Sequence, residues 1–443
     1  SISNNVGGLS SYFARMWASK PYNFIRTGSK RVFSKIPPAL KAIHRAEEYM
    51  KGMVSPGTLF EEIGFNYIGL IDGHNASGLV EILQNIKTLR GPQLLHIVTQ
   101  KGKGYSESEK DPFGMHAMSK IEAKSANSKN ANTDQHILSY SEVFGSWLCD
   151  TAEKDSLAVG ITPAMGEGSG MRKFAEKFPG RFHDVAIAEQ HAVTFAAGLA
   201  CEGARPIVAI YSTFLQRAYD QLIHDVALQN LNVLFAIDRA GLVGEDGPTH
   251  AGSFDISFLR CIPNLIIMTP SDESETYRAL STGYEFNGPA AVRYPRGKGI
   301  GIPIDKSMRP LEVGKGLLRR DGNTIAIFAF GSMVKAALEA AEKLGATLVD
   351  MRFVKPLDEE LISELAASHQ LVVTVEESAV MGGAGSAVNE FLAKTSSPIQ
   401  TLNLGLPDKF LEHGKPSEML DEINLNCEGI IQAIKNKQNE CGL

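Results

Sequence analysis

The sequence predicts an α/β protein built from three doubly wound α/β domains. Short apolar runs typical of buried strands recur along the chain, and helical patterns fill several of the gaps between them. This alternation restarts after a polar segment, which indicates separate sheets. A chain of 443 residues with 43% hydrophobic content is long enough for about three domains, each with its own core.

The first predicted domain covers residues 1–118. Its clearest elements are two apolar strands, Tyr67–Ile71 and Gln93–Thr99, which flank the helical pattern Ser77–Lys87. The order strand, helix, strand implies a parallel pair joined by a crossover helix.

The second predicted domain covers residues 136–312 and follows a linker at residues 119–135. The linker is rich in Ser, Asn, Lys and Ala and has little apolar periodicity. The expected strands of this domain are Leu157–Ile161, Ile207–Ile210, Val233–Ile237, Leu265–Met268 and Ala290–Arg293.

The third predicted domain covers residues 313–443. Its expected strands are Thr324–Phe330, Ala346–Asp350 and Leu371–Val375. The glycine-rich turn Met381–Ser386 then precedes a helical pattern and could hold a phosphate at a helix start. It lacks the full dinucleotide fingerprint and the lysine of a P-loop, so close helix–strand packing is the favoured interpretation.

Composition favours a protein that acts on small molecules. A net charge of −6 without long blocks of like charge argues against nucleic acid or an anionic membrane as the main partner. No apolar run approaches the roughly 18 residues that span a bilayer, and the first residues lack a signal-peptide layout. Five scattered cysteines fit a reducing cytosol, and no His, Cys or Asp group has convincing metal spacing.

Glu189 stands out because it lies in a run of small and apolar residues, Asp184–Ala197, with no cation just before it. Burial there would disfavour the ionised carboxylate and raise the pKa, a property that often accompanies catalysis. The alternative is that Glu189 caps, or forms an ion pair within, an ordinary helix beginning near Ala188.

Polar side chains gather where the strands of the second domain end, which is where α/β domains bind ligands. Arg239 and Arg296 each follow an apolar strand and together would suit a phosphate dianion. Either arginine could instead pair with a local acid, Asp238 or Asp246. Tyr211 could donate a further hydrogen bond to the same anion or simply lie at the edge of the core.

Two loop histidines could move protons, because their ordinary pKa suits that role. His250 follows the turn at Gly247-Pro248, and His116 lies on an earlier loop. A single loop histidine is, however, more often only solvated. The loop Lys101–Tyr105 places a tyrosine beyond the end of a strand.

Several motifs of the chain resemble the transketolase group of thiamine-diphosphate enzymes and, within it, the 1-deoxy-D-xylulose-5-phosphate synthase family. The resemblance to the pyrimidine-binding domain of these enzymes rests on residues 184–198, 211–221, 238–250 and 293–297. It extends to residues 52–67, 72–74, 101–105 and 351–357, and so spans essentially the whole chain.

The resemblance implies how the cofactor would be held. Glu189 would hydrogen-bond a pyrimidine nitrogen of thiamine diphosphate and favour the form that activates the thiazolium carbon. Phe214 would stack on the aminopyrimidine ring, and Tyr105 and Arg217 would also contact the cofactor.

The resemblance also implies the reaction, a transfer in which pyruvate loses carbon dioxide and condenses with D-glyceraldehyde 3-phosphate. The product, 1-deoxy-D-xylulose 5-phosphate, begins the non-mevalonate isoprenoid route and feeds thiamine and pyridoxal synthesis. Tyr211, Arg239 and Arg296 would hold the substrate phosphate and Asp246 its hydroxyl group. His250 and His116 would assist proton movements.

The chain departs from the family pattern at its start. The family carries a Gly-Asp-Gly segment, a later asparagine that helps it hold Mg²⁺ and the diphosphate, and a still earlier catalytic histidine. Ser1–Leu9 corresponds to the piece just after that asparagine. We therefore expect a truncated chain, inactive by itself, whose first domain lacks its opening strands and whose magnesium ligands lie upstream.

The resemblance further implies a homodimer, with the third domain mainly packing at the dimer interface. It suggests a bacterial cytoplasm or, as an alternative, a plastid stroma. One competing interpretation is the beta subunit of a 2-oxo acid dehydrogenase, although that subunit would begin near the second domain. Another is a non-catalytic protein derived from the enzyme scaffold.

Overall fold

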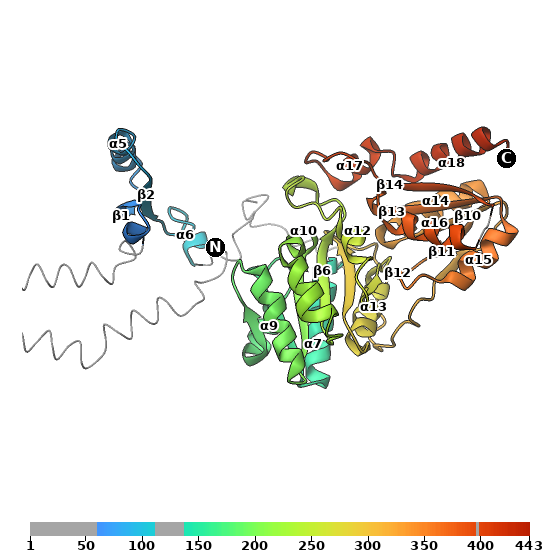
Figure 1. Cartoon of the computed structure of the whole chain (residues 1–443), viewed down its shortest axis with the longest axis horizontal. Helices are drawn as coiled ribbons and strands as arrows, with labels where there is room; N and C mark the ends of the chain where they lie inside the picture. Colours follow the sequence, from blue (N-terminus) through green and yellow to red (C-terminus); the bar gives the residue numbers. More distant parts are fainter. Residues whose placement is uncertain (1–59, 111–136, 396–397) are drawn as a thin grey trace, which may run out of the picture. The chain divides into compact units, whose positions relative to one another are not determined.

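The computed structural model describes residues 60–110, 137–395 and 398–443 (Figure 1). The chain divides into two compact units, with the described residues 60–110 in one and those from 137 onward in the other. Each unit is described by itself. His116 and the expected linker at residues 119–135 lie outside the described residues.

The smaller unit confirms the predicted strand–helix–strand order. Strands β1 (Asn66–Asp72) and β2 (Gln93–Val98) pair in parallel, and helix α5 (Ala76–Ile86) connects them. The side chain of Asn75 accepts a hydrogen bond from the Gly78 amide and so begins α5. A short helix, α6 (Ser106–Lys110), follows the Lys101–Tyr105 loop.

The larger unit contains a seven-stranded sheet in the order β12-β7-β8-β6-β5-β3-β4. All neighbouring strands in it are parallel except β12 and β7. The five strands expected from the sequence are all present. The strands are β3 (Ala158–Thr162), β4 (Phe182–Asp184), β5 (Arg205–Tyr211), β6 (Leu234–Ala240), β7 (Ile266–Met268), β8 (Ala290–Pro295) and β12 (Phe353–Lys355).

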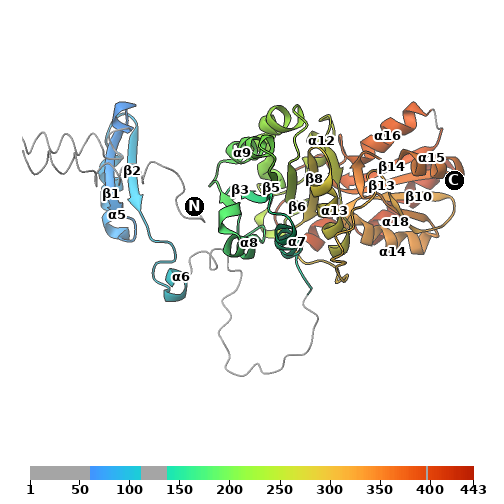
Figure 2. The same ribbon diagram turned by 90° about the horizontal axis from the view of Figure 1, so that it is seen from below.

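Helices cover both faces of this sheet (Figure 2). One face packs against α9 (Glu189–Cys201), a π-helical segment (Leu222–Ala227) and α12 (Asp255–Leu259), and the other against α7 (Tyr140–Lys154), α8 (Arg172–Lys177) and α13 (Glu273–Glu285). The alternation of side chains along each strand produces this two-faced burial. The sheet is therefore buried on both faces, which is why its strands appear as continuous apolar runs.

A second, five-stranded sheet has the order β14-β13-β10-β11-β9. Its strands are β9 (Leu317–Arg320), β10 (Ile325–Ala329), β11 (Thr347–Asp350), β13 (Leu371–Ala379) and β14 (Gln400–Leu406). Its helices are α14 (Val334–Leu344), α15 (Glu359–Ser368), α16 (Ala384–Lys394), α17 (Pro416–Glu422) and α18 (Cys427–Cys441). Figure 2 shows α15 and α16 on one side of the sheet and α14 and α18 on the other.

Four strands were not expected from the sequence: β4, β9, β12 and β14. Two of them make the antiparallel pairs, β9 with β11 and β12 with β7. Strand β12 has only three residues and pairs with a strand more than 80 positions earlier, so no local sequence pattern predicts it. Strand β12 lies in the sequence between β11 and β13 of the five-stranded sheet, yet it forms an edge of the seven-stranded sheet.

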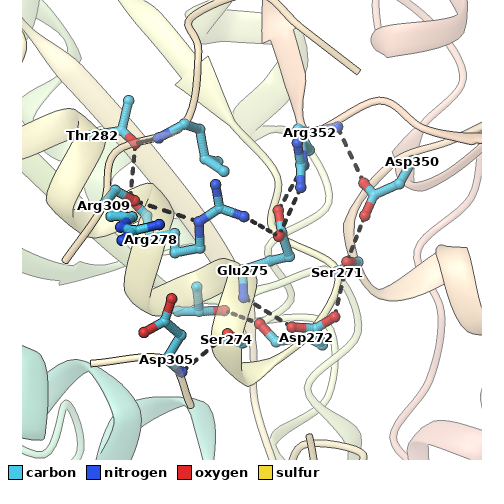
Figure 3. Close-up of polar contacts among 12 residues, drawn as sticks. Ser271, Asp272, Ser274, Glu275, Arg278, Thr282, Asp305, Arg309, Asp350 and Arg352 are labelled. Carbon is cyan, nitrogen blue, oxygen red and sulfur yellow. Dashed lines mark hydrogen bonds and ion pairs between the residues drawn. The ribbon is translucent and has the colours of Figure 1, made fainter. Parts of the chain in front are cut away.

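Polar contacts join the two sheets near β12 (Figure 3). Arg352 donates from Nη2 to Oε1 of Glu275 at 2.9 Å, and its Nε lies 2.7 Å from Oε2. Ser271 donates to Oδ2 of Asp350 at 2.7 Å. Burial is the main cause of the raised pKa of Asp350. These buried acids and cations fix how the two sheets pack against each other.

The Arg352→Met substitution should lower the free energy of unfolding by about 1.5–3 kcal/mol, because Glu275 would lose its principal cation while remaining buried. Urea denaturation provides the measurement. The double variant Glu275→Gln, Arg352→Met is the matched control and should recover part of the loss. A single variant as stable as the wild type would show that this pair does not hold the sheets together.

Candidate active site

The parallel order of the larger sheet brings four polar strand ends to one edge. In the register of β5 and β6, Tyr211 lies opposite Asp238, and in that of β6 and β8, Ala240 lies opposite Pro295. Arg239 is therefore next to Asp238 and Ala240, which belong to these aligned pairs, and Arg296 is one residue beyond Pro295. Tyr211 and Arg296 are 85 positions apart in the sequence, yet they lie at the ends of β5 and β8, which are separated in the sheet only by β6.

Glu189 is the first residue of α9 and is only 3% exposed. Its Oε1 accepts a hydrogen bond from Nη1 of Arg217 at 2.8 Å. The sequence showed no cation beside Glu189 because Arg217 is 28 positions away. The helix does begin where the sequence predicted, but the cation that pairs with Glu189 lies outside that helix.

The turn before Glu189 is fixed by Asp184, a residue that the sequence prediction did not assign to the site. One oxygen of Asp184 accepts hydrogen bonds from the amides of Ala164 and Ala186, both at 2.9 Å. Ala186 has a φ of 60°, a conformation that side chains rarely adopt. Asp184 therefore stabilises the strained turn that precedes Glu189 and positions it.

Phe214 is the centre of an aromatic wall that is connected to Glu189 through Arg217. The guanidinium carbon of Arg217 lies 5.2 Å from the centre of its ring. Tyr211 stacks on it at 5.9 Å, and His250 meets it edge-on at 5.3 Å. Thr249 shares a hydrogen bond of 2.9 Å with Nδ1 of His250. The wall offers a flat apolar surface beside a buried carboxylate.

Arg239 and Arg296 converge, as predicted, and they converge on Asp246. Their Nη1 atoms donate to the same Asp246 oxygen, from 2.6 Å and 3.0 Å respectively. Pairing with a local acid was the alternative for either arginine, and the structure shows that pairing for both. Phosphate binding by the two arginines stays a prediction. Asp246 lies at Gly244–Asp246, a short 3₁₀ turn, and occupies the place where an anion would meet both guanidinium groups.

Tyr211 joins this cluster through its ring and its hydroxyl group. The guanidinium of Arg239 lies 4.0 Å from the centre of the ring. Burial raises the pKa of Tyr211 to about 12, so its hydroxyl group keeps its proton as a donor. A Cβ at Gly168 would come within 1.8 Å of that hydroxyl oxygen, so only glycine leaves room there.

Asp238 holds the backbone of Arg239 rather than its guanidinium. Arg239 has a φ of 57°, and its amide donates to Oδ1 of Asp238 at 2.7 Å. Ser141 donates to the other oxygen at 2.8 Å. The carboxyl group is fully buried, and this burial raises the pKa of Asp238 to about 6. The sequence named Asp238 only as a possible local partner of the guanidinium.

Tyr105 belongs to the smaller unit, and the other predicted site residues that the structure describes belong to the larger one. Its side chain is 40% exposed and its hydroxyl group donates to Glu107 at 3.0 Å. That hydrogen bond is the main cause of the raised pKa of Tyr105. The predicted roles of Tyr105 and His116 therefore remain predictions.

The glycine-rich turn at residues 381–386 holds an internal anion. The amides of Ala384 and Gly385, at the start of α16, donate to the two oxygens of Glu376, each at 2.8 Å. Burial raises the pKa of Glu376 to about 7. The favoured interpretation as a packing turn fits this arrangement, because a carboxylate of the chain occupies the helix start.

Neither a metal-binding cluster nor a membrane-spanning helix is found in the described part of the chain. Residues 60–110, 137–395 and 398–443 contain no group of three or more His, Cys, Asp or Glu side chains placed to hold a metal ion. In the same residues, no helix is both long and apolar enough to cross a bilayer.

Comparison with known families gives three matches along the chain. Residues 137–300 match the transketolase pyrimidine-binding domain, and residues 314–430 match the transketolase C-terminal domain. Residues 1–99 match a family described as 1-deoxy-D-xylulose-5-phosphate synthase.

Curated proteins and solved structures give similar results. The 1-deoxy-D-xylulose-5-phosphate synthase of Hahella chejuensis is 60% identical over all of this chain, which covers 69% of that protein. The enzyme of the same name from Pseudomonas aeruginosa is 60% identical over 99% of the chain, which also covers 69% of it. A structure titled split gene transketolase, inactive beta4 tetramer, is 30% identical with a TM-score of 0.61, covering 68% of this chain and 98% of its own.

Replacing Asp238 by Asn should change how stability depends on pH. A raised pKa in the folded state adds stability below the ordinary pKa of 3.8, and this stability is lost as the pH rises through about 6. Between pH 4.5 and 7.5 the wild type should therefore lose on the order of 2 kcal/mol that the variant does not lose.

Urea denaturation of both proteins at the two pH values gives the measurement. The Asn side chain can still accept from the Arg239 amide, so the fold should be retained. Identical pH dependence in the wild type and in Asp238→Asn would contradict the expected titration of this carboxyl group.

Proposed function

The chain belongs to the 1-deoxy-D-xylulose-5-phosphate synthase family, and from this membership we propose that it serves the reaction for which that family is named. In this reaction pyruvate loses carbon dioxide and its remaining two carbons join D-glyceraldehyde 3-phosphate. The product is 1-deoxy-D-xylulose 5-phosphate. The chain is thus part of a transferase of the transketolase type that depends on thiamine diphosphate.

The observation that carries the proposal is an unbroken series of contacts at one sheet edge. It runs from Glu189 through Arg217 and Phe214 to Tyr211, and from there through Arg239 and Asp246 to Arg296. His250 joins it at Phe214. One chain of contacts therefore connects a buried acid with two cations, which supports a common site for cofactor and phosphate.

The residues at one end of this series fit the pyrimidine part of thiamine diphosphate. When bound, this cofactor supplies a carbon nucleophile and a place for the electrons released by decarboxylation. We propose that Glu189 holds a proton at a pyrimidine nitrogen, a role that its burial supports. Phe214 offers the flat face on which the ring stacks, and Arg217 holds the carboxyl group of Glu189 in place and contacts the cofactor.

The other end of the series fits a phosphate monoester. Arg239 and Arg296 already bind one acidic oxygen of Asp246, and the hydroxyl group of Tyr211 is a nearby donor. We propose that the phosphate of glyceraldehyde 3-phosphate binds these three side chains. Asp246 would then turn to accept a hydrogen bond from a substrate hydroxyl group.

The remaining roles are also proposals. His250 lies against the aromatic wall, where an imidazole can pass a proton to or from a bound substrate. His116 is proposed for the same task and Tyr105 for cofactor contact. We propose that Mg²⁺ binds with the diphosphate through residues other than the described ones, and that the protein is a homodimer in the bacterial cytoplasm.

Two other interpretations are less well supported. The match of residues 1–99 to the synthase family argues against the beta subunit of a 2-oxo acid dehydrogenase, which would begin near the second domain. A non-catalytic scaffold has no need to keep Glu189, Arg239 and Arg296 in one connected cluster.

The direct test is product formation by the full-length protein with thiamine diphosphate, Mg²⁺, pyruvate and glyceraldehyde 3-phosphate. We expect 1-deoxy-D-xylulose 5-phosphate, detected by mass spectrometry, and release of carbon dioxide that is much faster when the aldehyde is present. Absence of this product under these conditions would contradict the proposed function.

The Arg296→Ala substitution should raise the KM for glyceraldehyde 3-phosphate about ten- to a hundredfold, because one charge-assisted contact with the phosphate is lost. The KM for pyruvate should stay nearly unchanged. Steady-state kinetics with each substrate varied in turn would show this difference. Lys298→Ala, which removes an exposed cation two residues away, is the matched control.

An equal rise in both KM values for Arg296→Ala would place the phosphate site elsewhere. So would a Lys298→Ala effect as large as that of Arg296→Ala, because it would indicate a general loss of positive charge.

A further inference from the structure

The loop that carries Asp246 and His250 is closed at its base by two glycines. The amide of Gly241 donates to the carbonyl of Gly252 at 2.9 Å, and the reverse hydrogen bond is 2.8 Å long. The loop therefore leaves β6 and returns to the same point. Any contact that fixes the backbone at this base therefore also fixes the position at which Asp246 binds the two arginines.

Glu377, on β13 of the other sheet, lies against this base. Its Oε1 accepts a hydrogen bond from the amide of Leu242 at 2.7 Å. Its Oε2 accepts one from the hydroxyl group of Ser332 at 2.5 Å. Both the Leu242 and Glu377 residues are buried. The loop amide thus has an acceptor from a distant part of the chain.

The backbone of Gly241 leaves room for this acceptor. Gly241 has a φ of 77°, which favours glycine, and a Cβ there would come within 2.4 Å of Oε1 of Glu377. The carboxylate of Glu377 can therefore approach the loop because the residue at the loop base is a glycine.

Strand β13 also holds the returning end of the loop. The carbonyl of Ser253 accepts hydrogen bonds from the amide of Ala379 at 2.8 Å and the hydroxyl group of Ser378 at 3.0 Å. Arg293 donates to the carbonyls of Gly252 and Glu377 at 3.4 Å and 3.0 Å. Both ends of the loop are therefore fastened to the segment 377–379.

We propose that Glu377 is a positioning residue that sets the site loop, and through Asp246 the two arginines, for binding of the substrate phosphate. This inference rests on the proposed function, because it assigns the phosphate site to Arg239 and Arg296. It also gives the C-terminal sheet a part in the reaction, whereas the sequence suggested only packing at a dimer interface.

The neighbouring acid, Glu376, provides a matched control within the same strand. It is equally buried, but its carboxylate binds the amides of Ala384 and Gly385 at the start of α16 instead of the site loop. Removing either carboxylate leaves buried amides without an acceptor. Only the removal of Glu377 should reach the phosphate site.

The test compares Glu377→Ala, Glu377→Gln and Glu376→Ala in the full-length holoenzyme. Glu377→Ala should raise the KM for glyceraldehyde 3-phosphate about tenfold, with the KM for pyruvate nearly unchanged. Glu377→Gln keeps an acceptor oxygen and should restore most of the affinity. Glu376→Ala should leave both KM values close to those of the wild type.

Amide hydrogen exchange supplies a readout that does not depend on activity. In Glu377→Ala the exchange of residues 241–247 should be faster than in the wild type by about tenfold, while Glu376→Ala should affect the start of α16 instead. If Glu377→Ala does not fold, Ser332→Ala, which removes only the second partner of the carboxylate, should give smaller changes in the same direction.

The outcomes separate this inference from the proposed function. A wild type that makes no 1-deoxy-D-xylulose 5-phosphate contradicts the function itself. A wild type that makes it, with Glu377 variants that match Glu376→Ala in KM and in loop exchange, contradicts the positioning role. Equal defects in Glu377→Ala and Glu377→Gln in both KM values would also contradict it, because they would indicate a general structural loss.

Discussion

The parallel register of β5, β6 and β8 is the constraint on which the site depends. It aligns Tyr211 with Asp238 and Ala240 with Pro295, so that the polar residues beyond each strand meet at one edge. The helices on both faces bury this sheet and fix that register, because a shift by one residue would turn every side chain to the opposite face. The same edge receives Glu189 from the start of α9. The packing of the apolar strands therefore brings charged side chains close together. Without this packing the side chains would repel one another or remain in contact with water.

Carboxylates of the chain fill several places that could hold a bound anion. Asp246 lies between the two arginines, Glu376 caps α16, and Glu377 accepts from the site loop. The first of these is partly exposed and can turn away, whereas the other two are buried. We propose that a substrate phosphate replaces Asp246 between the two arginines, whereas Glu376 and Glu377 hold the backbone of their segments in place. In this proposal Asp246 keeps the arginines in position before the substrate binds, which lowers the cost of ordering them.

The sequence predicted most of this arrangement and missed parts of it for physical reasons. Every expected strand of the three sheets is present, because buried parallel strands leave continuous apolar runs. The convergence of Arg239 and Arg296 was predicted from strand ends alone. Contacts between distant segments were not predictable in this way: Arg217 for Glu189, Glu377 for the Leu242 amide, and β12 at the edge of the larger sheet. These depend on how elements that are distant in the sequence pack together, which no local pattern encodes.

We propose that Glu189, buried at the start of α9 and bound by Arg217, activates the thiamine cofactor. The most direct measurement is deuterium exchange at the reactive thiazolium C–H of thiamine diphosphate bound to the full-length protein, followed by NMR after acid quench. Glu189→Gln should slow this exchange at least about a hundredfold while the protein still folds, since a neutral amide cannot take over the proton transfer proposed for the carboxyl group. Exchange at the wild-type rate in this variant would mean that Glu189 does not activate the cofactor.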